Sequence, residues 1–256
     1  MGIRGRAARL LGHARPPAPQ DPHQPSVASA TTDEERAVID EVRMLTMISE
    51  ERLLANMDAV RYVVQNDVPG ALVECGVWRG GSVLAMVRVL QALDVDDRDV
   101  YLYDTFEGMT EPGEADTSPY DRPASETWAQ TPTGMTPWGW AFDPSIYDLE
   151  FVQKVMASSG YPQERFHFVK GPVEDTLPGT VPPAVAVLRL DTDWYDSTLH
   201  EMRHLYPVLS PGGVLIIDDW GHWVGSRRAV EEYFATEAPP IFLSRIDYSG
   251  RMGVKH

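Results

Sequence analysis

Two short acidic stretches are the residues most able to do chemistry in this chain. Asp191 and Asp193 follow one apolar run, and the pair Asp218 and Asp219 follows another. Such runs predict buried parallel strands, whose carboxyl ends meet at one edge of a sheet. Carboxylates gathered there would repel one another, and their oxygens suit Mg²⁺. We therefore predict a divalent cation on Asp191, Asp218 and Asp219, with simple capping of the following helices as the alternative.

A base is expected beside that cation. Sugar and phenol hydroxyl groups are poor nucleophiles until they lose a proton, and a bound metal ion would make such a group more acidic. Asp193, two residues after Asp191, is placed to take the proton. His222 follows the second acidic stretch and is the alternative base, although a lone histidine in a loop is more often a surface residue.

A glycine-containing turn from Glu74 to Ser82 separates an apolar run from a helical pattern. Glycines let the backbone approach a ligand, and the N–H groups of the helix start face it. The turn is not the G-x-G-x-x-G of dinucleotide sites. Asp104 ends the next predicted strand, where an acid can accept hydrogen bonds from ribose hydroxyls. These residues predict a nucleoside-containing cofactor, and a structural turn with a capping aspartate is the alternative.

The elements that must hold these residues alternate along the chain. A helical pattern at 32–66 leads into strands at 71–76, 100–104, 166–169, 184–190 and 214–217, with helices at 82–93, 199–209 and 226–235 and a closing antiparallel pair at 241–246 and 250–255. The alternation predicts an α/β fold with a doubly wound, mostly parallel sheet covered on both faces.

The stretch of about 111–147 interrupts this alternation. It is rich in Pro, Gly and Thr and carries Trp128, Trp138 and Trp140. Loops of this length in a compact domain are usually lids or binding loops. Its aromatic residues either cover a substrate or pack the loop onto its own domain.

Composition narrows the class of partner. The net charge of −16 argues against nucleic acid and anionic membranes, which bind clustered Lys and Arg. The single cysteine, Cys75, excludes an intrachain disulfide, and no apolar run is long enough to span a bilayer. We expect a cytoplasmic protein with a small-molecule substrate, built as a flexible arm at 1–31 and one domain at 32–256.

Several ordered segments resemble the macrocin O-methyltransferase (TylF-type) family. They are 73–81, 104–108, 190–198 and 209–219, and the likeness covers about 45–254. The resemblance implies a class I methyltransferase (Rossmann-like) fold with a seven-stranded sheet. It also implies S-adenosylmethionine, Mg²⁺ and methylation of a deoxysugar hydroxyl of a glycosylated compound in an antibiotic pathway.

The resemblance also implies roles for individual residues. The metal ligands would be Asp191, Asp218 and Asp219, and the base Asp193. Met47 belongs to a segment that folds over the cofactor, Asp104 contacts its ribose and Phe106 lies beside its adenosine. The implied cofactor residues are Met47, Glu74, Gly76, Trp78, Ser82, Asp104, Phe106, Gly108, Val173, Glu174 and Asp191.

Other functions fit parts of the pattern. A catechol or another phenol could replace the sugar as acceptor. Asp191 and Asp193 could form the Asp-x-Asp motif of a metal-dependent glycosyltransferase, and a nucleotide-binding protein without turnover could keep the same fold. The apolar N-terminal helices at 32–68 predict a homo-oligomer.

Overall fold

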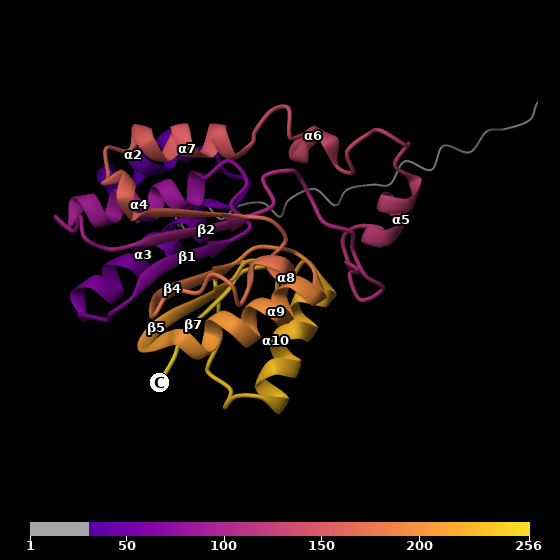
Figure 1. Ribbon diagram of the computed structural model, residues 1–256. Helices are drawn as coiled ribbons and strands as arrows, with labels where there is room; N and C mark the ends of the chain where they lie inside the picture. Colours follow the sequence, from indigo (N-terminus) through magenta and orange to yellow (C-terminus); the bar gives the residue numbers. More distant parts are fainter. Residues whose placement is uncertain (1–30) are drawn as a thin grey trace, which may run out of the picture. The chain divides into compact units, whose positions relative to one another are not determined.

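The computed structural model describes residues 31–256, and the arm predicted at 1–31 lies outside this part apart from its last residue. A seven-stranded sheet forms the centre, in the order β3-β2-β1-β4-β5-β7-β6 (Figure 1). The strands are β1 (Ala71–Cys75), β2 (Val100–Asp104), β3 (Phe166–Lys170), β4 (Val185–Leu190), β5 (Leu209–Ile217), β6 (Ser244–Arg245) and β7 (Arg251–Val254). The first five run parallel, and β7 is antiparallel to both of its neighbours. The predicted fold class is confirmed.

Helices cover both faces of the sheet (Figure 1). One layer contains α2 (Asp33–Val42), α3 (Glu50–Gln65), α4 (Gly81–Ala92) and α7 (Leu149–Ser158). The other contains α8 (Val173–Thr176), α9 (Tyr195–Leu205) and α10 (Val224–Thr236). Each layer buries its own apolar cluster, one around Val60 and Leu84 and the other around Met202 and Val230. Burying strands on both faces explains their continuous apolar runs.

Several boundaries differ from the prediction. Helix α9 starts at Tyr195 rather than 199, and α10 starts at Val224 rather than 226. The first turn of α9 contains Asp196 and Ser197, residue types that usually favour caps over helix interiors. Strand β5 starts at 209 rather than 214 and follows the short 3₁₀ turn Tyr206–Val208. Helix α7 was not predicted, although the side chain of Asp148 caps its first turn.

The predicted lid at about 111–147 is a long excursion with two short helices, α5 (Ala124–Gln130) and α6 (Gly139–Phe142). It lies beside the carboxyl ends of the central strands (Figure 1). A 3₁₀ turn at Gln163–Arg165 leads from α7 into β3. The excursion therefore sits where ligands bind in open α/β sheets.

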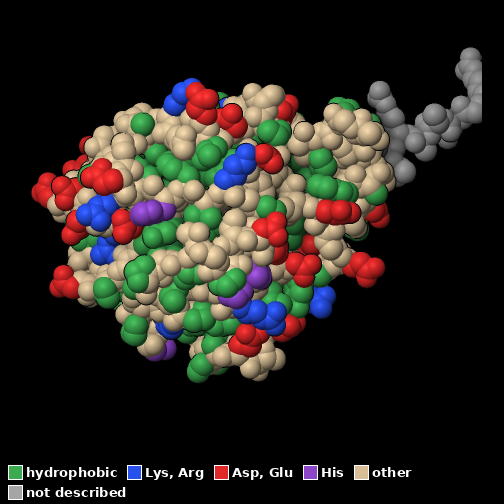
Figure 2. Space-filling model, in the orientation of Figure 1, with side chains coloured by type: hydrophobic (Ala, Val, Ile, Leu, Met, Phe, Trp, Pro, Cys, Tyr) green, Lys and Arg blue, Asp and Glu red, His purple; other side chains and the backbone are tan. Residues whose placement is uncertain are grey.

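Charge on the surface follows the composition. Asp and Glu side chains are more widespread than Lys and Arg on the face drawn in Figure 2. Within residues 31–256, no helix is both long enough and apolar enough to cross a membrane.

Candidate active site

A cavity of about 410 Å³ opens at the carboxyl ends of β1, β2, β4 and β5. Its walls combine the glycine turn after β1, the acids after β4 and β5, and the lid. Of the predicted site residues, the cavity is lined by Met47, Glu74, Gly76, Trp78, Ser82, Asp104, Gly108, Val173, Glu174, Asp191, Asp193, Asp218 and Asp219, together with the alternative base His222. One predicted residue, Phe106, is not among them.

Phe106 differs from the prediction because its side chain turns into the core. It is 1% exposed, packs within the apolar cluster of α3 and α4, and has a φ of 52° just after β2. Its backbone N–H donates to Asp104 at 2.7 Å. The residue therefore supports the site through its backbone, and its ring does not face the cavity.

Gly76 joins the ends of two strands. A Cβ atom at this position would lie 1.9 Å from the carbonyl oxygen of Asp191, and the φ is 81°. The neighbouring Cys75 carbonyl accepts a hydrogen bond from the backbone N–H of Asp191 at 2.8 Å. The glycine that the sequence assigned to ligand approach is thus also required for β1 to reach β4.

Asp104 organises the glycine turn. One carboxylate oxygen accepts the backbone N–H groups of Val77 at 2.7 Å and Trp78 at 3.0 Å, and the other accepts that of Phe106. Burial raises the pKa of Asp104, and the three N–H groups oppose this effect. The second oxygen is also 3.5 Å from the hydroxyl of Thr105, which donates at 2.5 Å to the carbonyl of Gly108. Because that single proton goes to the shorter contact, the second oxygen can accept a further donor such as a ligand hydroxyl group.

Glu74 has one oxygen with donors and one without. The first accepts hydrogen bonds from Ser82 and, at 2.7 Å, from Arg189. The second is buried and has no hydrogen-bond partner. Burial raises the pKa of this carboxyl group. A positively charged ligand group that could donate to the free oxygen would relieve its desolvation.

Two arginines that the sequence analysis did not select hold the acids together. Arg189 on β4 is fully buried and pairs with Glu74, with Asp191 at 2.8 Å, and with Asp218. Arg52 on α3 contacts Asp218 from the other side and Asp247 at 3.0 Å. An arginine inside the apolar run 184–190, one residue before its end, is the available signal, because buried charges require partners.

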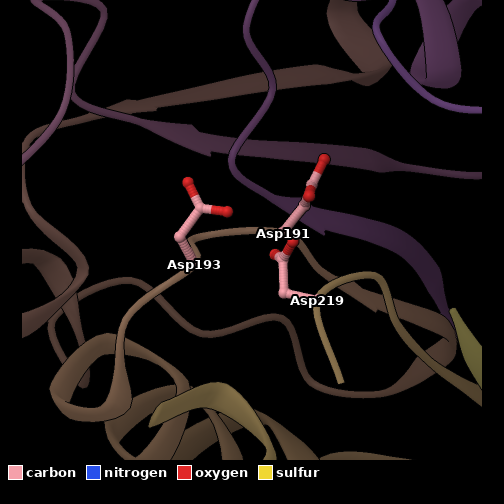
Figure 3. Close-up of side chains that lie close together, drawn as sticks. All are labelled: Asp191, Asp193 and Asp219. Carbon is pink, nitrogen blue, oxygen red and sulfur yellow. The ribbon is translucent and has the colours of Figure 1, made fainter. Parts of the chain in front are cut away.

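Three carboxyl groups gather beside these arginines, and only one of them, Asp191, pairs with Arg189. One oxygen each of Asp191, Asp193 and Asp219 lies within 4.8 Å of the others (Figure 3). Burial and the Asp191 charge raise the pKa of Asp193 to about 8. Burial and neighbouring acids likewise raise the pKa of Asp191 and of Asp219, whose second oxygen has no hydrogen-bond partner. The three carboxyl groups therefore concentrate negative charge that a cation would neutralise.

This cluster differs in one member from the predicted ligand set. Asp191 and Asp219 belong to both, whereas the structure brings Asp193 to them and turns Asp218 toward the two arginines. Asp218 still lines the cavity, and each carboxylate oxygen that accepts one N–H has a second lone pair. Hard oxygen donors in this arrangement fit a cation such as Mg²⁺.

Aromatic residues of the lid and the acidic loops meet over the cavity. The ring centroids of Trp138 and Trp194 are 5.8 Å apart, and those of Trp194 and Trp223 are 5.0 Å apart. Trp138 and Trp140 line the cavity, and Trp128 does not. The lid thus lines the cavity and also packs on its own domain, so the packing interpretation of its tryptophans holds while their contact with a substrate stays a prediction.

His222 is held between the lid and the C-terminal segment. One ring nitrogen is 3.1 Å from Asp121 of the lid, and the other is 3.1 Å from the hydroxyl of Tyr248. Burial lowers the pKa of His222. It is therefore a cavity residue rather than a free surface histidine.

Comparisons with known proteins agree with this geometry. The family model described as macrocin-O-methyltransferase (TylF) matches residues 20–252. An 8-demethyl-8-(2,3-dimethoxy-alpha-L-rhamnosyl)-tetracenomycin-C 4'-O-methyltransferase from Streptomyces olivaceus is 38% identical over 205 residues, which are 80% of this chain and 73% of that protein. The solved structure of the O-methyltransferase NovP is 34% identical, with a TM-score of 0.69 over 82% of each chain.

A narrower prediction from the same motifs was the sugar O-methyltransferase of the calicheamicin pathway. The solved calicheamicin methyltransferase CalS11 has a TM-score of 0.58 over 99% of each chain but is 17% identical, which shows the fold alone. The family match spans most of the chain and includes every acidic residue of the cavity. This chain is an O-methyltransferase and belongs to the macrocin O-methyltransferase family.

Proposed function

We propose that this enzyme transfers the methyl group of S-adenosylmethionine to a sugar hydroxyl of a glycosylated natural product, with the help of a divalent cation. The observation that carries the proposal is one cavity that joins the glycine turn at 74–82 and Asp104 to the acidic cluster. The relative that acts on a rhamnosyl-tetracenomycin supports the class of acceptor.

The cofactor would lie along the carboxyl ends of β1 and β2. The unpartnered oxygen of Glu74 suits the ammonium group of its methionine part, and Asp104 suits its ribose hydroxyls. Val173 and Glu174 line the cavity on the adenine side, and Met47 lies in the segment that would cover the cofactor.

The cation would be held by Asp191 and Asp219, with Asp218 beside them. When bound, it would lower the pKa of an acceptor hydroxyl in contact with it. Asp193 would take the proton as the hydroxyl oxygen attacks the methyl carbon and the carbon–sulfur bond breaks, leaving S-adenosylhomocysteine. Burial and the neighbouring carboxylates raise the pKa of Asp193, and the charge of a bound cation would oppose this effect and favour the carboxylate form that a base requires. His222 serves less well because both of its nitrogens have partners.

Calorimetry and turnover separate the parts of this proposal. We expect S-adenosylmethionine to bind with or without EDTA, and methylation of a glycosylated acceptor to require added Mg²⁺. Equal turnover after full chelation would reject the cation, and failure to bind the cofactor would reject the reaction. A panel of simple catechols tests the phenol alternative, since their turnover in place of glycosides would overturn the sugar acceptor.

The general base has its own variant. We expect Asp193→Asn to leave cofactor affinity within about twofold and to lower kcat by about 10² or more, the usual contribution of general base catalysis. His222→Asn is the matched comparison. A large loss in the histidine variant with normal turnover in Asp193→Asn would exchange the two roles.

The homo-oligomer remains a proposal. Met44 and Met47, after α2, are 74% and 48% exposed and offer apolar surface for pairing. Light scattering of the purified protein measures the mass of the assembly. A monomeric mass at micromolar concentration would contradict the proposed homo-oligomer.

A further inference from the structure

Asp116 is a buried acid of the lid that the proposed reaction does not use. It is 2% exposed, and its carboxylate accepts hydrogen bonds from the backbone N–H groups of Gly113 at 2.7 Å and Tyr195 at 2.8 Å. Burial raises the pKa of Asp116, and the two N–H donors oppose this effect. The first donor belongs to the lid itself, and the second is the first residue of α9. One side chain therefore joins the lid to the helix that follows the acidic loop.

Helices α9 and α10 lack side-chain caps of their own. Their N-cap residues are Trp194 and Trp223, and neither makes a capping hydrogen bond. The first N–H groups of a helix need partners from elsewhere, and a carboxylate is favoured at this end of the helix dipole. Asp116 supplies the partner for α9. For α10, the lid carbonyl of Thr117 accepts the N–H of Val224 at 2.8 Å.

Gly225 in the first turn of α10 makes room for the acid. A Cβ atom at this position would lie 1.9 Å from a carboxylate oxygen of Asp116 and 3.0 Å from the backbone nitrogen of Tyr195. The base of the lid is further tied by the indole N–H of Trp194, which donates to the carbonyl of Thr110 at 3.0 Å. Asp116 thus fits between two helix starts that both adjoin the cavity.

We propose that Asp116 is a positioning residue that fastens the lid to the starts of α9 and α10 and so completes the acceptor side of the active site. The fastened segment leads to Asp121 and Trp138, which line the cavity over the acids. The cofactor side is built from the turn after β1, which Asp116 does not touch. The residue acts on acceptor binding and leaves the bound cofactor in place.

Four variants test the contact: Asp116→Ala, Asp116→Asn, Gly225→Ala and the double variant. Asp116→Ala removes the carboxylate to which both N–H groups donate. We expect the KM for the methyl acceptor to rise about tenfold or more, as for a lost hydrogen bond to a charged group. The Kd of S-adenosylmethionine stays within about twofold, since its side of the cavity is intact. Asp116→Asn keeps one carbonyl oxygen and shows an intermediate effect. Glu114→Ala, which removes an exposed lid acid two residues away, is the control.

Gly225→Ala separates this role from helix stability. Alanine normally favours a helix over glycine, but its methyl group would meet the Asp116 carboxylate here, so a contact that only stabilises the fold predicts a less stable enzyme with an unchanged KM for the methyl acceptor. We expect instead a raised acceptor KM, because the methyl group displaces the Asp116 carboxylate. Adding Asp116→Ala to this variant causes little further loss, since both changes break one contact. Full additivity of the two effects would overturn the proposal.

Limited chymotrypsin digestion gives a readout that does not need an acceptor. The lid carries Tyr120 and Trp140, which are 61% and 82% exposed. We expect cleavage within the lid to be faster in Asp116→Ala and Gly225→Ala than in Glu114→Ala or the unaltered enzyme. Equal cleavage rates would overturn the proposal. The kinetic arm rests on the proposed function, so an unaltered enzyme that methylates no glycoside rejects that function while the digestion still decides the role of Asp116.

Discussion

Arg189 places a full positive charge inside an apolar strand. The unfavourable desolvation of this charge is offset only by the acids that pair with it. Glu74, Asp191 and Asp218 surround it, and its side chain has no exposed surface. A buried ion pair contributes little net stability compared with an apolar pair, but removing one partner leaves the others uncompensated. The arginine thus allows the acids to be brought together before any ligand binds.

Replacing this arginine should therefore be costly. We expect Arg189→Met to lower the free energy of unfolding by about 3–5 kcal/mol, because the buried Glu74 loses its counter-charge and the buried Asp218 keeps only Arg52. Urea denaturation measures this change in the free energy of unfolding. Arg203→Met is the comparison, since Arg203 is 45% exposed and pairs with Glu237 at the surface. A loss below about 1 kcal/mol, similar to that of a surface pair, would contradict the assigned role.

At the scale of elements, the cofactor side depends on how closely the segment 45–48 approaches α4. The backbone N–H of Gly81 donates to the carbonyl of Leu45 at 2.8 Å. A Cβ atom on Gly81 would lie 2.4 Å from that same oxygen. The glycine at the start of α4 therefore fixes the distance between the helix and the segment that lines the cavity.

Gly81→Ala tests this spacing. The substitution should help α4 as a helix, yet we expect weaker binding of S-adenosylmethionine by about tenfold, because the segment must move away from the cavity. Calorimetry measures the affinity. Gly139→Ala in α6 is the control, because its Cβ atom would make only an ordinary contact at 3.7 Å. Unchanged affinity in Gly81→Ala would show that the segment does not cover the cofactor.

For the molecule as a whole, a buried acid makes the free energy of unfolding decrease as the pH rises. Glu201 on α9 is fully buried, and one of its oxygens accepts a hydrogen bond from Thr192 at 2.9 Å while the other has no partner. Burial raises the pKa of this carboxyl group well above its ordinary range. The folded state therefore binds the proton more tightly than the unfolded state does.

The sign of the effect follows from proton linkage. The stability that the protonated Glu201 contributes is complete below the pKa of an unfolded glutamate, about 4.3, and is lost as the pH rises toward the folded pKa. We expect Glu201→Gln, which cannot ionise, to gain stability relative to the unaltered enzyme between pH 6 and pH 9, by at most about 1.4 kcal/mol per pH unit. Urea denaturation at both pH values checks this. Glu231→Gln, at an exposed position, should follow the unaltered enzyme, and parallel curves for all three proteins would refute the prediction.

The order of the elements and the place of the site follow from local patterns in the sequence. Apolar runs and glycine turns are local patterns, and parallel strands bring their carboxyl ends to one edge whatever the details of packing. Glu74, Asp104, Asp191 and Asp219 could therefore be assigned to one cavity from their positions at the ends of predicted strands. The family motifs added the methyl-transfer reaction, because they lie on those same turns.

The pairing of charged groups, in contrast, follows from how separate elements pack in the folded chain. Arg52 reaches Asp218 across 166 residues of sequence, and Asp116 reaches Tyr195 across 79. Such pairs depend on the packing of side chains from separate elements, which no local period encodes. The same cause turned Phe106 into the core and brought Asp193, rather than Asp218, into the acidic cluster. Burial then set the pKa values, because desolvation depends on what surrounds a carboxyl group rather than on its neighbours in the chain.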